Sequence, residues 1–178
     1  MYSDTAEPIK LVFAGSMGAG KSTAIGSIAD GEPISTDMPM SEGATDTKST
    51  TTVAFDFATV WLNDGTPLHI YGMPGQDYFS HMRSILLQGA LGVVLVLDGI
   101  DPDIGSSCEA WLHSLRENNS PTHVVIGITK TDMAPNFSLA PVRAALRRCE
   151  VTIPVFTFDA RSTEQTTHLV RALLVLIG

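Results

Sequence analysis

The fold is decided by the stretch Gly15-Ser16-Met17-Gly18-Ala19-Gly20-Lys21-Ser22, which lies between an apolar run, Ile9 to Ala14, and an amphipathic run, Ser22 to Ala29. The stretch matches the G-x-x-x-x-G-K-S pattern, and its flanks predict a strand before the loop and a helix after it. Glycines permit positive φ angles, so successive backbone N–H groups and the helix N-terminus point at an anion. The stretch therefore predicts a phosphate-binding loop, in which Lys21 reaches the β- and γ-phosphates of a nucleotide and the Ser22 hydroxyl binds Mg²⁺.

Short apolar runs alternate with longer amphipathic runs along the rest of the chain. The apolar runs predict strands buried on both faces, at residues 9–14, 91–98, 124–128 and 153–158. The amphipathic runs predict helices at residues 22–29, 78–88, 107–117, 139–148 and 163–177. This alternation is typical of an α/β fold with right-handed crossovers between parallel strands. Trp61 and Trp111 have strand and helix periodicity and are expected in the core.

One segment departs from this alternation. Apolar side chains recur at even intervals from Val53 to Trp61, and Asn63-Asp64-Gly65 separates them from a second apolar run, Leu68 to Ile70. We interpret the segment as a β-hairpin that is entered through a long polar loop from Gly31 to Thr50. The hairpin predicts one antiparallel strand in an otherwise parallel sheet.

Composition and charge limit the classes of function. The chain has 178 residues, 44% of them hydrophobic, and we expect one domain over residues 1–178. The net charge is -8 and the 11 Lys and Arg residues are not clustered, so nucleic acid and anionic membranes are not expected partners.

The two cysteines, Cys108 and Cys149, lie far apart, and the five histidines show no ligand spacing. Neither a disulfide framework nor a zinc site is predicted. No signal peptide or membrane-spanning run is predicted either, and we expect a cytoplasmic protein that a partner could recruit to a membrane.

Four further motifs follow the phosphate loop (residues 15–22). They are Thr50-Thr51-Thr52 at the start of the hairpin, Gly72-Met73-Pro74-Gly75-Gln76 after it, Thr129-Lys130-Thr131-Asp132, and Asp159-Ala160-Arg161 after the last strand. Their order and spacing resemble the Ras superfamily of small GTPases over nearly the whole chain. The resemblance implies a P-loop NTPase fold with a Ras-like, six-stranded mixed sheet, one strand antiparallel, and helices on both faces. It also implies a molecular switch that binds GTP or GDP with Mg²⁺ and hydrolyses GTP to GDP and phosphate.

The resemblance assigns the first two of these motifs to the γ-phosphate. Thr52, with Thr51 as a substitute, would close over this phosphate and ligate Mg²⁺. The Gly75 amide would contact the phosphate, and Gln76 would orient the attacking water.

Gly72 departs from the family pattern, because most members carry at this position the aspartate that holds a Mg²⁺-bound water. The nearest carboxylate that could replace it is Asp56 on the paired strand. No arginine lies between Gly31 and Thr50, and Arg83 on the following helix is interpreted as a surface or packing residue. We therefore expect slow intrinsic turnover and activation by a partner protein.

Asp132 decides the choice of base. Its carboxylate can accept hydrogen bonds from both N1–H and the 2-amino group of guanine, whereas adenine lacks this donor pair and would leave the acceptors unpaired. By resemblance, the motif is the Thr-Lys-x-Asp form of the base-recognition motif, and the Ala160 amide would face guanine O6.

The predicted site combines these assignments. The nucleotide-binding residues are Gly15, Ser16, Met17, Gly18, Ala19, Gly20, Lys21, Ser22, Thr23, Thr52, Gly75, Thr129, Lys130, Asp132, Asp159, Ala160 and Arg161. The catalytic residues are Lys21, Thr52 and Gln76, and the metal ligands are Ser22, Thr52 and Asp56.

Within the superfamily, the chain resembles a prokaryotic branch related to MglA and to the GTPases of actinobacterial conservon operons. The shared features are the string from Lys48 to Phe57, the Pro-Gly-Gln of the second motif and the Asp-Ala-Arg ending. The resemblance implies a roadblock-type dimeric protein, or another GTPase-activating protein, as partner. Two other classes stay open: a nucleotide-binding interaction module with little or no hydrolysis, and another P-loop ATPase or kinase.

Overall fold

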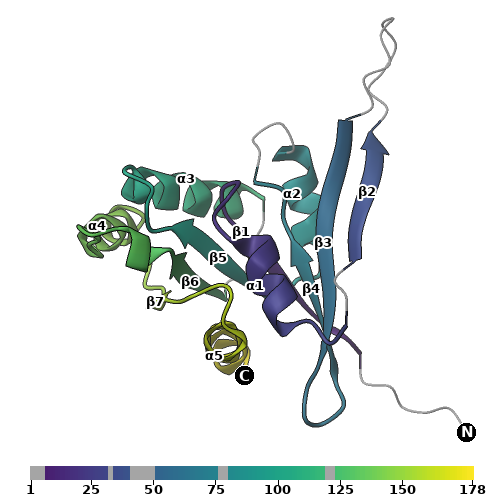
Figure 1. Ribbon diagram of the computed structural model, residues 1–178. Helices are drawn as coiled ribbons and strands as arrows, with labels where there is room; N and C mark the ends of the chain where they lie inside the picture. The colour runs from purple at the N-terminus through teal and green to yellow at the C-terminus, as the bar shows by residue number, and fades with distance from the viewer. Residues whose placement is uncertain (1–6, 32–33, 41–50, 76–79, 119–122) are drawn as a thin grey trace, which may run out of the picture.

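The computed structural model describes the backbone of residues 7–31, 34–40, 51–75, 80–118 and 123–178, and the side chains of all of these except 34–40, 51–55, 80 and 81. The described strands form one sheet with helices on both faces (Figure 1). The strands are β1 (Ile9–Ala14), β2 (Ile34–Met40), β3 (Thr51–Trp61), β4 (Pro67–Gly72), β5 (Gly92–Asp98), β6 (Val124–Thr129) and β7 (Val155–Thr157). The helices are α1 (Lys21–Ile28), α2 (Ser80–Leu87), α3 (Ile104–Glu117), α4 (Ala140–Arg148), α5 (Thr163–Ile177) and a short 3₁₀ helix, η2 (Thr131–Met133).

The strands lie in the order β2-β3-β4-β1-β5-β6-β7. β3 pairs antiparallel with β2 and β4, and every other neighbouring pair is parallel. All six expected strands are present, and the prediction of a mixed, Ras-like sheet with one opposed strand is confirmed.

The seventh strand, β2, corrects the expectation of a continuous loop from Gly31 to Thr50. It pairs with β3 from Ile34 opposite Phe57 to Met40 opposite Thr51. β4 pairs only with residues 56–61 of β3. β2 supplies the backbone hydrogen-bond partners for the first part of β3, which begins at Thr51. Pro39 made this segment a poor strand candidate, but β2 is an edge strand, where proline is tolerated.

Two hydrophobic cores hold the helices on the sheet. Successive residues of a strand point to opposite faces, so β5 directs Val93, Leu95 and Leu97 to one core and Val94 and Val96 to the other. The first core includes residues of α2, α3 and α4, and the second includes residues of α1 and α5. The loops after β1, β6 and β7 therefore meet at one end of a sheet that is covered on both sides.

The two tryptophans differ from each other. Trp111 on α3 is buried, as predicted, whereas the prediction of a core position for Trp61 is wrong because its side chain is 59% exposed. Trp61 is the last residue of β3, where the hairpin begins to turn. At the end of the strand, the alternation of side chains no longer predicts burial against a helix. Among the described helices, none combines the length and the apolar character that crossing a bilayer requires.

Candidate functional site

The phosphate loop connects the end of β1 to the first turn of α1. Gly15, Gly18 and Gly20 have φ angles of 141°, 78° and 101°, in the left-handed region that favours glycine. At Gly15 a Cβ atom would also lie 2.1 Å from the Val96 carbonyl oxygen, so a side chain is excluded on two grounds. The local sequence thus forms the concave loop that its glycine spacing predicts.

Lys21 lies inside this loop rather than in solvent. Its Nζ donates hydrogen bonds to the carbonyl oxygens of Gly15 and Ser16, both at 2.7 Å, and the residue is 8% exposed. Burial lowers the pKa of Lys21 to about 8, and the negative charge of Asp56 partly offsets this effect. An anion bound in the loop would compensate the desolvation of the ammonium group and raise this pKa again.

Asp56 reaches the phosphate loop from β3, which β4 separates from β1 in the sheet. The Ser22 hydroxyl donates a hydrogen bond to Asp56 Oδ2, and the register of β3 and β4 places Asp56 directly opposite Gly72. A Cβ atom at Gly72 would lie 3.0 Å from Asp56 Cβ and 3.2 Å from Asp56 Oδ2. The carboxylate of Asp56 therefore occupies the space in front of position 72, where the sequence resemblance led us to expect an aspartate.

Gly75 packs directly against the phosphate loop. A Cβ atom on Gly75 would lie 2.3 Å from the Met17 nitrogen and 2.8 Å from the Gly15 oxygen, so only glycine fits. A backbone hydrogen bond two residues before Gly75 holds this segment near β1: the Met73 N–H donates to the Phe13 carbonyl oxygen at 2.8 Å. Gln76 lies outside the described residues, and only the backbone position of Thr52 in β3 is described.

A pocket of about 280 Å³ opens beside the loop, between the segments that follow β6 and β7. It is lined by Gly20, Thr23, Ile100, Thr129, Lys130, Asp132, Met133, Asp159, Ala160 and Arg161. All but Ile100 and Met133 belong to the predicted nucleotide-binding set. Ile100 and Met133 add exposed apolar side chains, which no sequence motif indicated.

Thr129 and Lys130 attach this pocket to the phosphate loop. Thr129 Oγ1 donates to the Ala19 carbonyl oxygen at 2.7 Å, and Lys130 Nζ donates to the Gly18 carbonyl oxygen at 2.7 Å. Lys130 also forms an ion pair with Asp98 at 2.6 Å. No sequence motif indicated Asp98 as the partner of Lys130.

Asp132 and the Asp159-Ala160-Arg161 segment line the open side of the pocket. Asp132 lies in η2 and is exposed. Arg161 donates to Asp159 through Nε at 2.9 Å and Nη2 at 2.7 Å, and these bonds lower the pKa of Asp159 to about 2. Asp159 is therefore engaged with Arg161, whereas Asp132 is exposed and lines the pocket.

A known protein family has a sequence pattern that matches this chain from β1 to Asp132. The pattern described as "Ras of Complex, Roc, domain of DAPkinase" matches residues 10–132, which is more than half of the chain. The chain belongs to the Roc family of Ras-like small GTPases. The match includes the phosphate loop, the β3–β4 hairpin and the motif from Thr129 to Asp132, and it ends before the Asp159-Ala160-Arg161 segment.

Three relatives of this Roc-family chain are described as Ras-related proteins. It is 26% identical to the Ras-related protein SEC4 of Saccharomyces cerevisiae over 131 residues, which are 71% of this chain and 60% of that protein. It is 25% identical over 172 residues to the Ras-related protein RIC1 of Oryza sativa subsp. japonica, covering 95% of this chain and 78% of the relative. Rab-13 of Rattus norvegicus is 26% identical over 176 residues, with 95% and 81% covered.

A buried contact links α2 to the phosphate loop of this Roc-family chain. Trp111 Nε1 donates to Ser16 Oγ at 3.1 Å, and the guanidinium carbon of Arg83 lies 4.4 Å from the centroid of the Trp111 ring. Arg83 also donates to Ser114 Oγ at 2.7 Å and is 8% exposed. Of the two interpretations of Arg83 as surface or packing residue, the structure selects packing, while the contact of Trp111 with the loop was not predicted.

Proposed function

We propose that this chain is a molecular switch that binds GTP and GDP with Mg²⁺ and hydrolyses GTP slowly, and that residues 1–178 form one GTPase domain. The observation that carries the proposal is the direct attachment of the Asp132-lined pocket to the phosphate loop through Thr129 and Lys130. A nucleotide whose phosphates lie on the loop would place its base in this pocket. Membership of the Roc family supports the same activity.

The choice of guanine rests on Asp132. An exposed carboxylate at the pocket can accept hydrogen bonds from N1–H and the 2-amino group of guanine, and adenine offers no such donor pair. The Lys130 stem, Ile100 and Met133 would cover the faces of the base.

A competition titration tests the proposal. We expect GTP and GDP to displace a bound fluorescent guanine nucleotide at concentrations at least about 100-fold lower than ATP requires, because adenine leaves Asp132 without its donors. Equal displacement by ATP would contradict the assignment and would favour another P-loop ATPase or a kinase.

Mg²⁺ fits the donor set that the structure places beside the loop. This ion prefers carboxylate and hydroxyl oxygens, and the Ser22 hydroxyl and the Asp56 carboxylate are in direct contact at the start of α1. We propose Ser22, Thr52 and Asp56 as the residues that hold the ion. When bound, Mg²⁺ would neutralise charge on the β- and γ-phosphates.

Hydrolysis would depend mainly on positioning and on positive charge at the transferred phosphoryl group. Lys21 supplies charge from inside the loop, the Gly75 amide would contact the γ-phosphate, and Gln76 would orient water. Arg83 does not serve as an arginine finger in this arrangement, because Trp111 and Ser114 hold its guanidinium under α3. We therefore propose slow intrinsic turnover that a partner protein accelerates.

The absence of an aspartate at Gly72 supports a second candidate function, nucleotide binding with little or no hydrolysis. Single-turnover phosphate release separates the two candidates. We expect wild-type protein to release phosphate from GTP well below one per second, and Gln76→Leu to release it at least about tenfold more slowly because the attacking water is no longer oriented. Release that is equal in both proteins and no faster than in buffer would assign the chain to the non-hydrolysing class.

The finer placement of the chain rests on sequence resemblance. We propose that it belongs to the prokaryotic branch related to MglA and to the conservon GTPases, that it acts in the cytoplasm, and that a roadblock-type dimeric protein activates it or recruits it to a membrane. The string from Lys48 to Phe57 supports this placement, and its last residues carry Asp56, the proposed metal ligand.

A further inference from the structure

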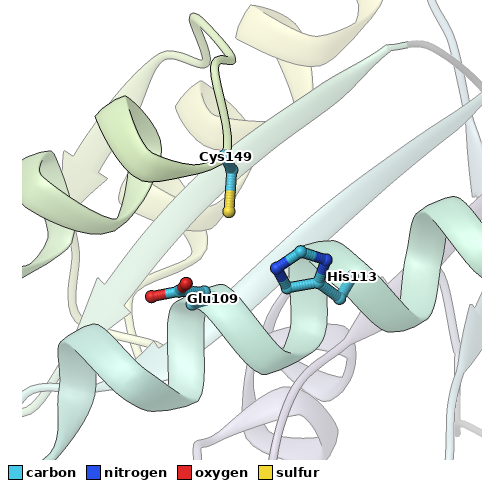
Figure 2. A group of neighbouring side chains, drawn as sticks. All are labelled: Glu109, His113 and Cys149. Atoms are coloured by element: carbon cyan, nitrogen blue, oxygen red, sulfur yellow. The ribbon is translucent and has the colours of Figure 1, made fainter.

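Three side chains with metal-binding atoms converge between α3 and α4, on residues that the proposed nucleotide site does not use. Glu109 and His113 lie one helical turn apart on the same face of α3, and Cys149 follows the last residue of α4. Their ligand atoms, a carboxylate oxygen, an imidazole nitrogen and Sγ, all lie within 4.8 Å of one another. Figure 2 shows the Cys149 sulfur directed at the turn of α3 that carries the other two residues.

We propose that Glu109, His113 and Cys149 bind a divalent transition-metal ion of the Zn²⁺ class. Atoms separated by no more than 4.8 Å leave a point within about 2.8 Å of all three, and Zn²⁺ bonds to such ligands are about 2.0–2.3 Å long. Each ligand atom therefore needs to move by less than about 1 Å. A set of one nitrogen, one sulfur and one oxygen is typical of Zn²⁺ and related ions, whereas Mg²⁺ and Ca²⁺ prefer oxygen ligands alone.

The surrounding contacts hold two of the three ligands in place. The Cys149 N–H donates to the Ala145 carbonyl oxygen at 2.9 Å, and the Cys149 carbonyl oxygen accepts from Arg116 Nη2 at 3.0 Å. Glu109 Oε2 accepts from Arg148 Nε at 2.8 Å, which orients the carboxylate and leaves its other oxygen for the ion. His113 is exposed and free to rotate its ring toward the ion.

The charges at this site are compatible with a dication. The Glu109 carboxylate and a Cys149 thiolate together match the charge of Zn²⁺, and Arg148 occupies the carboxylate oxygen that the ion does not need. The second cysteine, Cys108, is fully buried on α3 and does not belong to the group of three converging side chains. The bound ion would connect α3 to α4, and it does not depend on the proposed GTPase activity.

Cobalt substitution tests the proposal on the full chain. Protein stripped of transition metals with a chelator and kept in excess Mg²⁺ is titrated with Co²⁺, which occupies Zn²⁺ sites and gives a sulfur-to-metal charge-transfer band only when a thiolate is a ligand. We expect the band at one equivalent in the wild type and in Cys108→Ala, and its loss in Cys149→Ala. The chain has two cysteines, so this matched pair identifies the sulfur.

A pair of exposed histidines supplies a second readout that does not alter the core. His113→Ala is expected to weaken Co²⁺ binding at least about tenfold, while His168→Ala on α5 changes it by less than about twofold. Zn²⁺ should raise the Tm of the wild type and not that of His113→Ala. The proposal is overturned if the wild type shows no thiolate band, if the band survives in Cys149→Ala, or if the two histidine variants bind Co²⁺ equally.

Discussion

Asp132→Asn is expected to change the nucleotide preference from guanine to xanthine. The wild-type carboxylate accepts two hydrogen bonds from guanine, at N1–H and at the 2-amino group. The side-chain amide of the Asp132→Asn variant offers one acceptor and one donor, so its NH₂ group would face the 2-amino group of guanine and both donors would lose a partner. Xanthine has a carbonyl at this position, and its N1–H and O2 match the amide oxygen and the amide NH₂.

The expected size of this change follows from the cost of unpaired polar groups in a binding site. Loss of one such pairing discriminates by orders of magnitude, so we expect Asp132→Asn to weaken GDP binding at least about 100-fold and to bind xanthosine diphosphate more tightly than GDP. Competition titrations with both nucleotides measure the reversal. Asp64→Asn, the same chemical change in the exposed β3–β4 turn, is the matched control and should keep the guanine preference. An Asp132→Asn variant that still prefers GDP would remove Asp132 from the base site.

Asp56→Gly and Gly72→Asp are each expected to damage the protein when made alone. Made together, they exchange the two residues between β3 and β4, and we expect Mg²⁺ binding to be largely preserved. Asp56→Gly alone removes the carboxylate from Ser22, and we expect Mg²⁺ affinity, measured by nucleotide release during chelation, to fall about 10- to 100-fold. Gly72→Asp alone forces a new side chain to within 3.0 Å of Asp56 Cβ and places two carboxylates together. Such overpacking costs about 1–3 kcal/mol of unfolding free energy before charge repulsion is added.

The double variant, Asp56→Gly with Gly72→Asp, removes the obstacle and moves the carboxylate to the strand where the family pattern has it. Glycine rather than alanine is needed at position 56, because the 3.0 Å contact is with the Asp56 Cβ atom itself. Ile25 Cδ1, 3.1 Å from the new Cβ, is the flexible end of a side chain and can move. We expect the double variant to recover most of the lost Mg²⁺ affinity. If Asp56→Gly leaves Mg²⁺ affinity unchanged, Asp56 does not serve the metal.

The local elements were predictable because their signals are short in sequence. The phosphate loop needs glycines where φ is positive, and Gly15, Gly18 and Gly20 have such angles. The helix expected at residues 163–177 begins and ends as predicted, because its apolar period and the Ser162 cap, which accepts from the Gln165 N–H, are encoded within the segment. β2 was not predicted, because it lacks such a local signal. Pro39 weakens the strand pattern of the segment, and the pairing that stabilises β2 is with β3, outside the segment.

For the candidate site, the sequence indicated which residue types to expect but not all of their partners. Lys21, Thr129 and Asp132 were identified from motifs, and the structure places Lys21 in the phosphate loop and the other two along the adjoining pocket. The contact of Trp111 with Ser16 and the ion pair of Lys130 with Asp98 join segments far apart in the chain. No motif records such pairs.

Fold class, the phosphate loop and the order of the strands and helices other than β2 follow from local sequence, because glycine spacing and hydrophobic periods of two and 3.6 residues act over a few neighbouring residues. Tertiary structure alone decides that Asp56 faces Gly72, that Trp111 reaches the phosphate loop, and that Cys149 meets Glu109 and His113. Each of these depends on strand register or helix packing, which sets distances between residues that the chain itself keeps far apart.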